Sequence, residues 1–108
     1  RLEAGLHRLV DRRAIDADEA YFALAPKPDF YNLYFIHNLH FLAYAAMMEA
    51  NYQASSDAAR KIEETVPAAF LKNYVTLADG FMPTTLNVMI RFGKWQDVLG
   101  EPEPESWR

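Results

Sequence analysis

Two adjacent helical runs in the middle of the chain carry the clearest pattern of hydrophobic and polar positions. The first run, His37 to Glu49, is apolar on nearly every side, whereas the second, Gln53 to Thr65, is apolar on one side only. A helix that is apolar all round must be buried between neighbours, and an amphipathic helix covers the core from one side. Because only a tight turn at Asn51-Tyr52 separates the two runs, the pattern predicts a helical hairpin.

Helical spacing also marks the segments on both sides of this hairpin. Residues 2–15 form a first helix, which either ends before a short helix over residues 16–24 or continues through it without a break. Pro26 and Pro28 end that helical stretch in either case, so residues 25–31 are expected to form a loop. Further helices are expected over residues 68–80, 83–92 and 95–99. The sequence therefore predicts an all-α fold of five to six helices.

The residues of the hairpin resemble the tetratricopeptide repeat (TPR), a helical hairpin of 34 residues with a degenerate pattern of small and large positions. The residues that occupy the positions of this pattern are Leu39, Leu42, Ala43, Ala46, Ser55, Ala59 and Pro67. Ala46 and Ala59 stand where the family usually has aromatic residues. The resemblance implies an α-α superhelix in which one complete repeat spans residues 36–67.

A second turn supports an internal repeat. The segment Gly93 to Gln96 resembles the turn Ala50 to Gln53, 43 positions earlier. We interpret the excess over the 34-residue period as an inserted helix between Pro67 and Met82. Residues 1–100 would then form a single TPR-like domain with a half repeat, the full repeat and a partial repeat over residues 82–100, followed by an acidic, proline-rich tail over residues 101–108 that is expected to be extended and solvated.

Three runs narrow the resemblance to a bacterial group of TPR proteins of unassigned function. These runs are DEAY at residues 18–21, the stretch over residues 32–49 with Tyr31 just before it, which contains HNLHFL and AAMME, and RFGKW at 91–95. Together with the hairpin they span most of the chain. The resemblance implies a scaffold or adaptor that binds other proteins.

Composition excludes several classes of function. The 108-residue chain has a formal net charge of -4 and no block of Lys and Arg, so it lacks the basic surface that nucleic acid binding needs. The absence of cysteine excludes disulfides and thiolate metal sites and is compatible with a cytoplasmic location, which we expect. The longest apolar run, Phe41 to Met48, is too short to span a bilayer, so no membrane association is expected.

The candidate binding surface lies on the first helix of the hairpin. Leu39, Leu42, Ala43 and Ala46 are expected to face the second helix, and the roughly opposite face carries His37, His40, Tyr44 and Met47. In TPR proteins this face lines the groove that receives a partner peptide, so the resemblance makes these four residues candidates for a protein or peptide partner. The alternative is that a neighbouring helix covers the face, most simply the segment after Pro67.

Chemistry beyond binding has little support in the sequence. His37 and His40 share a helix face and are weak candidates for a metal site, but no Asp, Glu or Cys lies within one turn of them. Asp16, Asp18 and Glu19 are better explained as acidic residues near a helix start than as catalytic groups. We therefore expect a protein-interaction module without a cofactor or catalytic activity. The alternative is a metal- or small-ligand-binding helical domain centred on the two histidines, possibly part of a larger enzyme.

Uncovered apolar residues at both ends of the predicted helical domain indicate self-association. Leu2, Leu6, Leu9 and Val10 have no preceding helix to cover them, and Met89, Ile90, Phe92 and Trp95 lack a complete following helix. Exposed apolar patches of this kind mark interfaces, and a twofold dimer is the commonest oligomer. We expect a homodimer that forms through one of these ends.

Overall fold

The structure is a computed structural model that describes residues 2–24, 29–66 and 68–103. Its helices are α1 (Leu2–Leu24), α2 (Asp29–Met48), α3 (Tyr52–Thr65), α4 (Ala68–Asn73), α5 (Val75–Ala78), α6 (Thr84–Arg91) and α7 (Trp95–Gly100), with the short 3-10 helix η1 (Asp79–Phe81) before α6. The described residues contain no strand. The predicted all-α class is confirmed.

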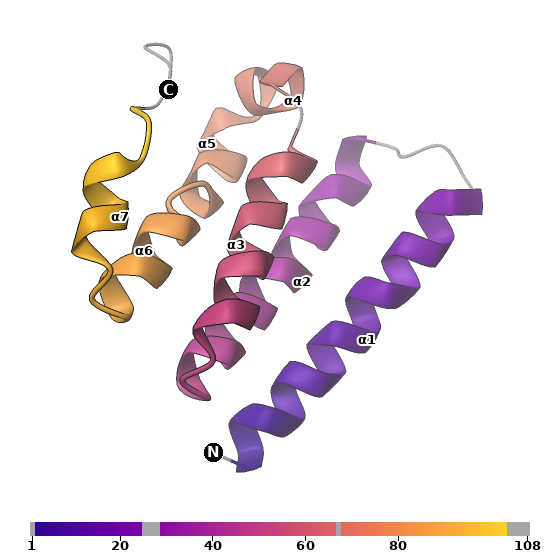
Figure 1. Cartoon of the computed structure of the whole chain (residues 1–108). Coiled ribbons are helices and arrows are strands. Elements are labelled where there is room, and N and C mark those ends of the chain that lie inside the picture. Colours follow the sequence, from indigo (N-terminus) through magenta and orange to yellow (C-terminus); the bar gives the residue numbers. More distant parts are fainter. Residues whose placement is uncertain (1, 25–28, 67, 104–108) are drawn as a thin grey trace.

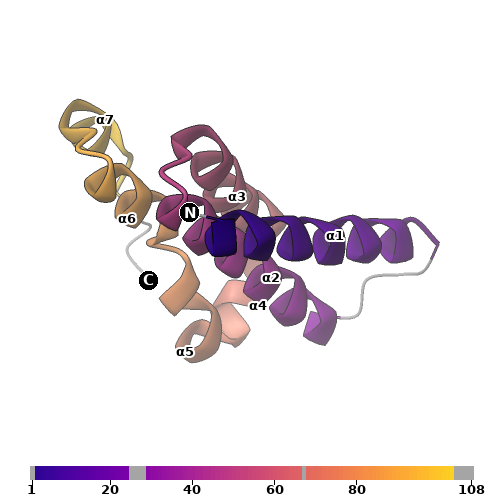
Figure 2. The same cartoon turned by 90° about the horizontal axis from the view of Figure 1, so that it is seen from below.

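The long helices lie side by side, and α2 occupies the centre. It packs against α1 on one side and against α3 on another, while α6 packs against both α3 and α2. α1 and α7 lie at opposite edges of the array (Figures 1 and 2). The short helices α4 and α5 connect the end of α3 to the α6–α7 pair (Figure 1).

Near the prolines, the structure decides between two alternatives for α1 and corrects the start of α2. α1 continues without a break through Leu24, which selects the second of the two alternatives for residues 2–24. α2 already begins at Asp29, so the expectation of a loop through Tyr31 is wrong for residues 29–31. The reason is that proline restricts the residue before it and not those after it, so a helix can begin immediately beyond Pro28.

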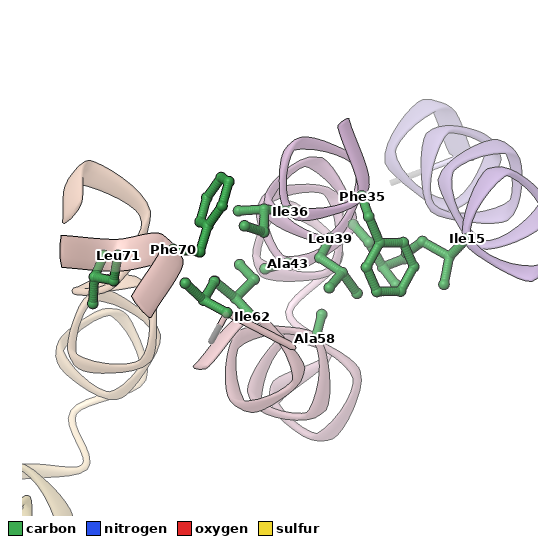
Figure 3. Close-up of a cluster of buried hydrophobic side chains, with 11 residues drawn as sticks. Ile15, Phe35, Ile36, Leu39, Ala43, Ala58, Ile62, Phe70 and Leu71 are labelled. Carbon is green, nitrogen blue, oxygen red and sulfur yellow. The ribbon is translucent and has the colours of Figure 1, made fainter. Parts of the chain in front are cut away.

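The hydrophobic core lies between α2 and the helices α1, α3 and α4 (Figure 3). Every residue predicted to be buried in the hairpin is at most 3% exposed, namely Leu39, Leu42, Ala43, Ala46, Ala59 and Ile62. Ile15 of α1 and Phe70 and Leu71 of α4 extend the same cluster. Burial of large apolar side chains stabilises a fold by about 1.5–3 kcal/mol each, so this cluster is the main stabilising feature of the fold.

Polar contacts fix the inner face of α1 against the hairpin. They are the pair Arg8–Glu49, the pair Lys61–Glu19 and a hydrogen bond of 2.9 Å from Asn38 Nδ2 to Asp18 Oδ2. Gly5 stands where α1 approaches Glu49, and a Cβ atom at this position would lie 3.2 Å from Glu49 Oε1. The cost of glycine within a helix is therefore offset by this close approach between α1 and the end of α2.

The same turn closes both helical hairpins. After α2, Ala50 has a φ of 58°, Asn51 N–H donates to Ala46 O (2.8 Å) and Ala50 N–H donates to Met47 O (3.1 Å). After α6, Gly93 has a φ of 69°, Lys94 N–H donates to Met89 O (2.8 Å) and Gly93 N–H donates to Ile90 O (3.1 Å). Both are Schellman motifs, in which one residue in the left-handed region ends the helix. The likeness of the two turns in the sequence is thus also a likeness in backbone structure.

The two turns contact each other. The ring centroids of Tyr52 and Phe92 lie 5.3 Å apart, and Lys94 Nζ lies 4.8 Å from the centroid of the Tyr52 ring. At the first turn, Asn51 Oδ1 also accepts a hydrogen bond of 3.1 Å from Ala54 N–H and caps α3. These contacts hold the two hairpins in a fixed relative position.

The segment between the hairpins is less regular than predicted. One helix was expected over residues 68–80, but the structure breaks it at Tyr74 into α4 and α5, and η1 follows. Pro83 immediately precedes α6, where its missing N–H costs nothing. When α4 and α5 are counted as one interrupted helix, the described α-helices number six. Pro67, the last position of the TPR pattern, lies outside the described residues.

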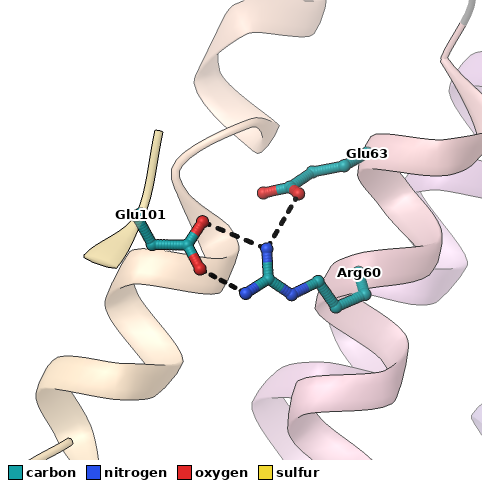
Figure 4. A network of polar contacts seen from close by, with 3 residues as sticks. All are labelled: Arg60, Glu63 and Glu101. Carbon is teal, nitrogen blue, oxygen red and sulfur yellow. Dashed lines mark hydrogen bonds and ion pairs between the residues drawn. The ribbon is translucent and has the colours of Figure 1, made fainter. Parts of the chain in front are cut away.

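The start of the predicted tail is tied to α3 instead of being solvated (Figure 4). Arg60 donates from Nη2 to Glu101 Oε1 and from Nη1 to Glu101 Oε2 (3.1 Å), and it also contacts Glu63 (3.4 Å). The Glu101 side chain is 16% exposed. The hydrogen bond from Arg60 lowers the pKa of the Glu101 carboxyl. The expectation that the whole tail is solvated is therefore wrong at Glu101, and residues 104–108 lie outside the described part.

The two small residues of the hairpin provide a test of its packing. Ala46 and Ala59 are both 0% exposed. Ala46→Phe should overpack the hairpin and lower the free energy of unfolding by about 1–3 kcal/mol, measured by urea denaturation. Ala69→Phe, the same change at an exposed position of α4, is the control and should have little effect. A neutral or stabilising Ala46→Phe would show that an unfilled space remains there.

The Arg60–Glu101 pair predicts a pH dependence of stability. Because the folded-state pKa of Glu101 is lowered, its contribution is complete above the ordinary glutamate pKa of about 4.3 and is lost as the pH falls through the lower pKa of the folded state. Arg60 is 41% exposed, so solvent screens the pair and its contribution at neutral pH should be about 1 kcal/mol or less. Glu101→Gln should therefore differ from the parent in urea denaturation at pH 7 and converge with it in acid. Equal stabilities at neutral pH would contradict this.

Candidate functional site

Between His37 and Met48, α2 exposes a single row of side chains, and its other residues there are buried or half-buried. His37, Phe41, Tyr44 and Met48 are spaced four, three and four residues apart, and all four are exposed. Phe41 is 48% exposed, Tyr44 53% and Met48 41%. At a rise of about 1.5 Å per residue the row is about 16 Å long. We refer to these four residues as the α2 stripe.

The α2 stripe overlaps the face expected from the sequence but is centred differently. His37 and Tyr44 are exposed as expected, whereas His40 and Met47 are half-buried at its edge. Phe41 and Met48 were missed. The signal that could have found them is the helical angle of about 100° per residue, which places Phe41 and Met48 opposite the buried positions Leu39 and Ala46.

Aromatic contacts orient the two histidines of α2. The His37 ring packs edge-on against Phe41 at a centroid distance of 4.5 Å, and the His40 ring packs in the same way against Phe81 of η1 at 5.2 Å. Burial, and secondarily the charge of His37, lower the pKa of His40. Both effects favour the neutral form of the His40 imidazole. The segment after α3 thus contacts one edge of the α2 stripe and leaves its centre exposed.

The acidic residues of α1 that were considered as catalytic groups contact other side chains. Asp18 accepts a hydrogen bond from Asn38, and Glu19 forms an ion pair with Lys61. Asp16 Oδ1 lies 3.8 Å from Arg12 Nε. The described residues contain no group of three or more His, Cys, Asp or Glu side chains that could hold a metal ion. The structure therefore brings no further potential metal ligand to His37 and His40 within the part of the chain that it describes.

A small pocket lies between α1, α2 and α3. Its volume is about 290 Å³, and it is lined by Glu19, Phe22, Ala23, Phe35, Lys61 and Thr65. Its two charged groups pair with each other, and the rings of Phe22 and Phe35 pack edge to face with centroids 5.4 Å apart.

Comparisons of the chain with protein-family models, with curated proteins and with solved structures find no match. Among the described helices, none is both long enough and apolar enough to cross a bilayer.

The histidine pair can be tested directly with metal ions. Because two neighbouring imidazoles without a third ligand make an incomplete site, Zn²⁺, Ni²⁺ or Cu²⁺ should not raise the melting temperature of the protein. Thermal-shift measurements with each ion, followed by a chelator, check this. A saturable increase that disappears in His37→Gln would contradict the expectation and support the alternative of a metal-binding domain.

Proposed function

We propose that the chain is a protein-interaction module of the TPR-like class, which binds a protein partner through the α2 stripe and has no catalytic activity of its own. The observation that carries the proposal is the row of exposed His, Phe, Tyr and Met side chains on α2, the helix with the largest number of buried residues in the described part of the chain. Aromatic residues and Met are enriched at protein interfaces relative to the rest of the surface. Exposed apolar patches on a folded domain mark such sites.

The rigidity of α2 favours binding. Its other sides are packed against α1, α3 and α6, and Ile36, Leu39 and Ala43 are at most 1% exposed. The side chains of the stripe therefore project from a fixed backbone. A partner that docks on a fixed backbone does not have to order it, so less of the interaction energy is lost. The thioether of Met48 adds an adaptable contact.

The composition of α2 indicates the chemistry of the partner. Between Tyr31 and Met48 the helix contains no Asp, Glu, Lys or Arg, so the contact does not depend on ion pairs along the stripe. The spacing of four, three and four residues matches the apolar face of an amphipathic helix, which presents its own contacts at the same intervals. The partner is thus an amphipathic helical segment of another protein. Some TPR proteins bind the C-terminal carboxylate of a partner through basic residues. Because α2 has no Lys or Arg between Tyr31 and Met48, we do not propose this mode of binding.

Two features support the TPR-like class. The hairpin α2–α3 has buried small residues at positions of the TPR pattern, and a second hairpin with the same Schellman turn follows it. The inserted segment α4, α5 and η1 occupies the place where the sequence has its excess over one period. The lack of cysteine fits a reducing compartment, so we place the protein in the cytoplasm as part of this proposal.

The proposal can be tested with helical peptides selected for binding to the protein from a random displayed library. The double variant Phe41→Asp, Tyr44→Asp should weaken binding of the selected peptides by at least about thirty-fold, the size of a loss of about 2 kcal/mol at an interface hot spot. Leu99→Asp, which changes an 80% exposed residue of α7, is the control and should leave binding unchanged.

Amide chemical shifts give an independent readout in the unmodified protein. Binding of a selected peptide should perturb the resonances of residues 37–48 most strongly. Peptides that perturb only α1 or α7, or that bind the double variant as well as the parent, would contradict the proposal.

A further inference from the structure

The outer face of α1 carries a second regular row of exposed residues, which the proposed function does not use. Leu6, Val10, Arg13, Ala17, Ala20 and Leu24 alternate at intervals of four and three residues, and all six are exposed. Leu6 is 60% exposed, Val10 58% and Leu24 89%. This alternation is the spacing of a coiled-coil seam. The seam is about 27 Å long at a rise of about 1.5 Å per residue.

The opposite face of α1 is already occupied. Ile15 is 2% exposed in the core, and Arg8, Asp18 and Glu19 are held by residues of α2, of α3 and of the turn between them. α1 also forms one edge of the helical array, with no described segment beyond it (Figures 1 and 2). The seam therefore belongs to a face that the described part of this chain does not cover.

The seam is complementary to itself in the antiparallel orientation. A twofold axis level with Ile15 places Leu6 against Leu24 of a second copy, Val10 against Ala20 and Arg13 against Ala17. Each large residue then meets a small one except at the two ends, where leucine meets leucine. Small residues in the middle allow the helix backbones to approach closely, and helices packed at about 20° interdigitate in this way.

The charges of α1 favour the same orientation. Arg13 stands in the first half of the seam, and Asp16 stands beside the seam in its second half. A parallel pair would place Arg13 next to Arg13 of the second copy and Asp16 next to Asp16. An antiparallel pair brings Arg13 beside Asp16 of the second copy, twice across the axis, so opposite charges meet near the centre of the interface. A polar residue within an apolar seam lowers stability but fixes the register.

We propose that α1 pairs with α1 of a second copy of this chain in an antiparallel, twofold coiled coil, and that this pairing is the dimer interface. The occupant of the outer face is thus the same face of another copy. The interface is separate from the α2 stripe, so the dimer and the proposed function can each fail without the other.

Light scattering tests the dimer and its location. The chain at high micromolar concentration should have a mass near twice its 12.4 kDa. Val10→Asp should return the mass to that of one chain without loss of helicity, because the residue is exposed within its own chain. Leu99→Asp, at the other apolar end of the array, should remain dimeric.

The charges near the twofold axis allow the dimer to be disrupted by one substitution and restored by a second. Arg13→Glu places four carboxylates around the axis and should shift the equilibrium towards single chains. Adding Asp16→Arg to that variant recreates the opposite-charge pairs and should restore the dimer. Since the two variants change the same exposed turn of α1, general loss of folding cannot explain a restoration.

Cysteine cross-linking tests the orientation, because the chain has no cysteine of its own. An equimolar mixture of Val10→Cys and Ala20→Cys chains should form mainly the mixed disulfide in a thiol redox buffer, and mass spectrometry distinguishes it. Mainly homogeneous disulfides would overturn the antiparallel register. A parent chain of about 12 kDa, or a dimer that Leu99→Asp breaks and Val10→Asp does not, would overturn the interface.

Discussion

The burial of α2 between its neighbours is the constraint on which the rest of this fold depends. α1, α3 and α6 each cover one sector of the helix, and η1 reaches its edge through the contact between Phe81 and His40. Removing any one of these elements would expose apolar surface worth several side chains at about 1.5–3 kcal/mol each. The same arrangement leaves one sector open. The α2 stripe is thus a consequence of how the core is assembled and is fixed by it.

The turn after α2 recurs after α6, and the contacts between these two turns couple the two helical hairpins. Ala50 adopts a positive φ, which costs an alanine roughly 1 kcal/mol, while Gly93 adopts the same conformation at no steric cost. The cost at Ala50 is offset by the Schellman hydrogen bonds, by the Asn51 cap and by the contact of Tyr52 with Phe92 of the second turn. The two hairpins are therefore coupled through their turns. The bonds from Arg60 to Glu101 join them at the far end of α7.

Much of this could be predicted from the sequence, since helical spacing depends on local chemistry. The all-α class, the position of the α2–α3 turn and the burial of Ile62 followed from the hydrophobic pattern, and the burial of Leu39 and Ala43 followed from the geometry of a repeat hairpin. The start of α2 did not, because Pro28 permits either a loop or a helix immediately after it. The break at Tyr74 did not follow either, because it lies within a continuous helical pattern.

The binding surface was only half predictable. An all-round apolar helix does not show which side its neighbours cover, so the expected face was right at His37 and Tyr44 and missed Phe41 and Met48. The ion pair of Glu101 with Arg60 could not be predicted either, because the two residues lie 41 positions apart in the sequence and only the fold brings them together.

Native-state hydrogen exchange tests most directly whether the fold is organised around α2. Amides between Ile36 and Ala46 should exchange most slowly, through global unfolding, because this segment is enclosed on three sides. Amides of α1 and α7, at the edges of the array, should exchange faster through local opening. If the slowest amides lie instead in α1 or in the α6–α7 hairpin, and α2 exchanges as fast as the edges, the account is contradicted.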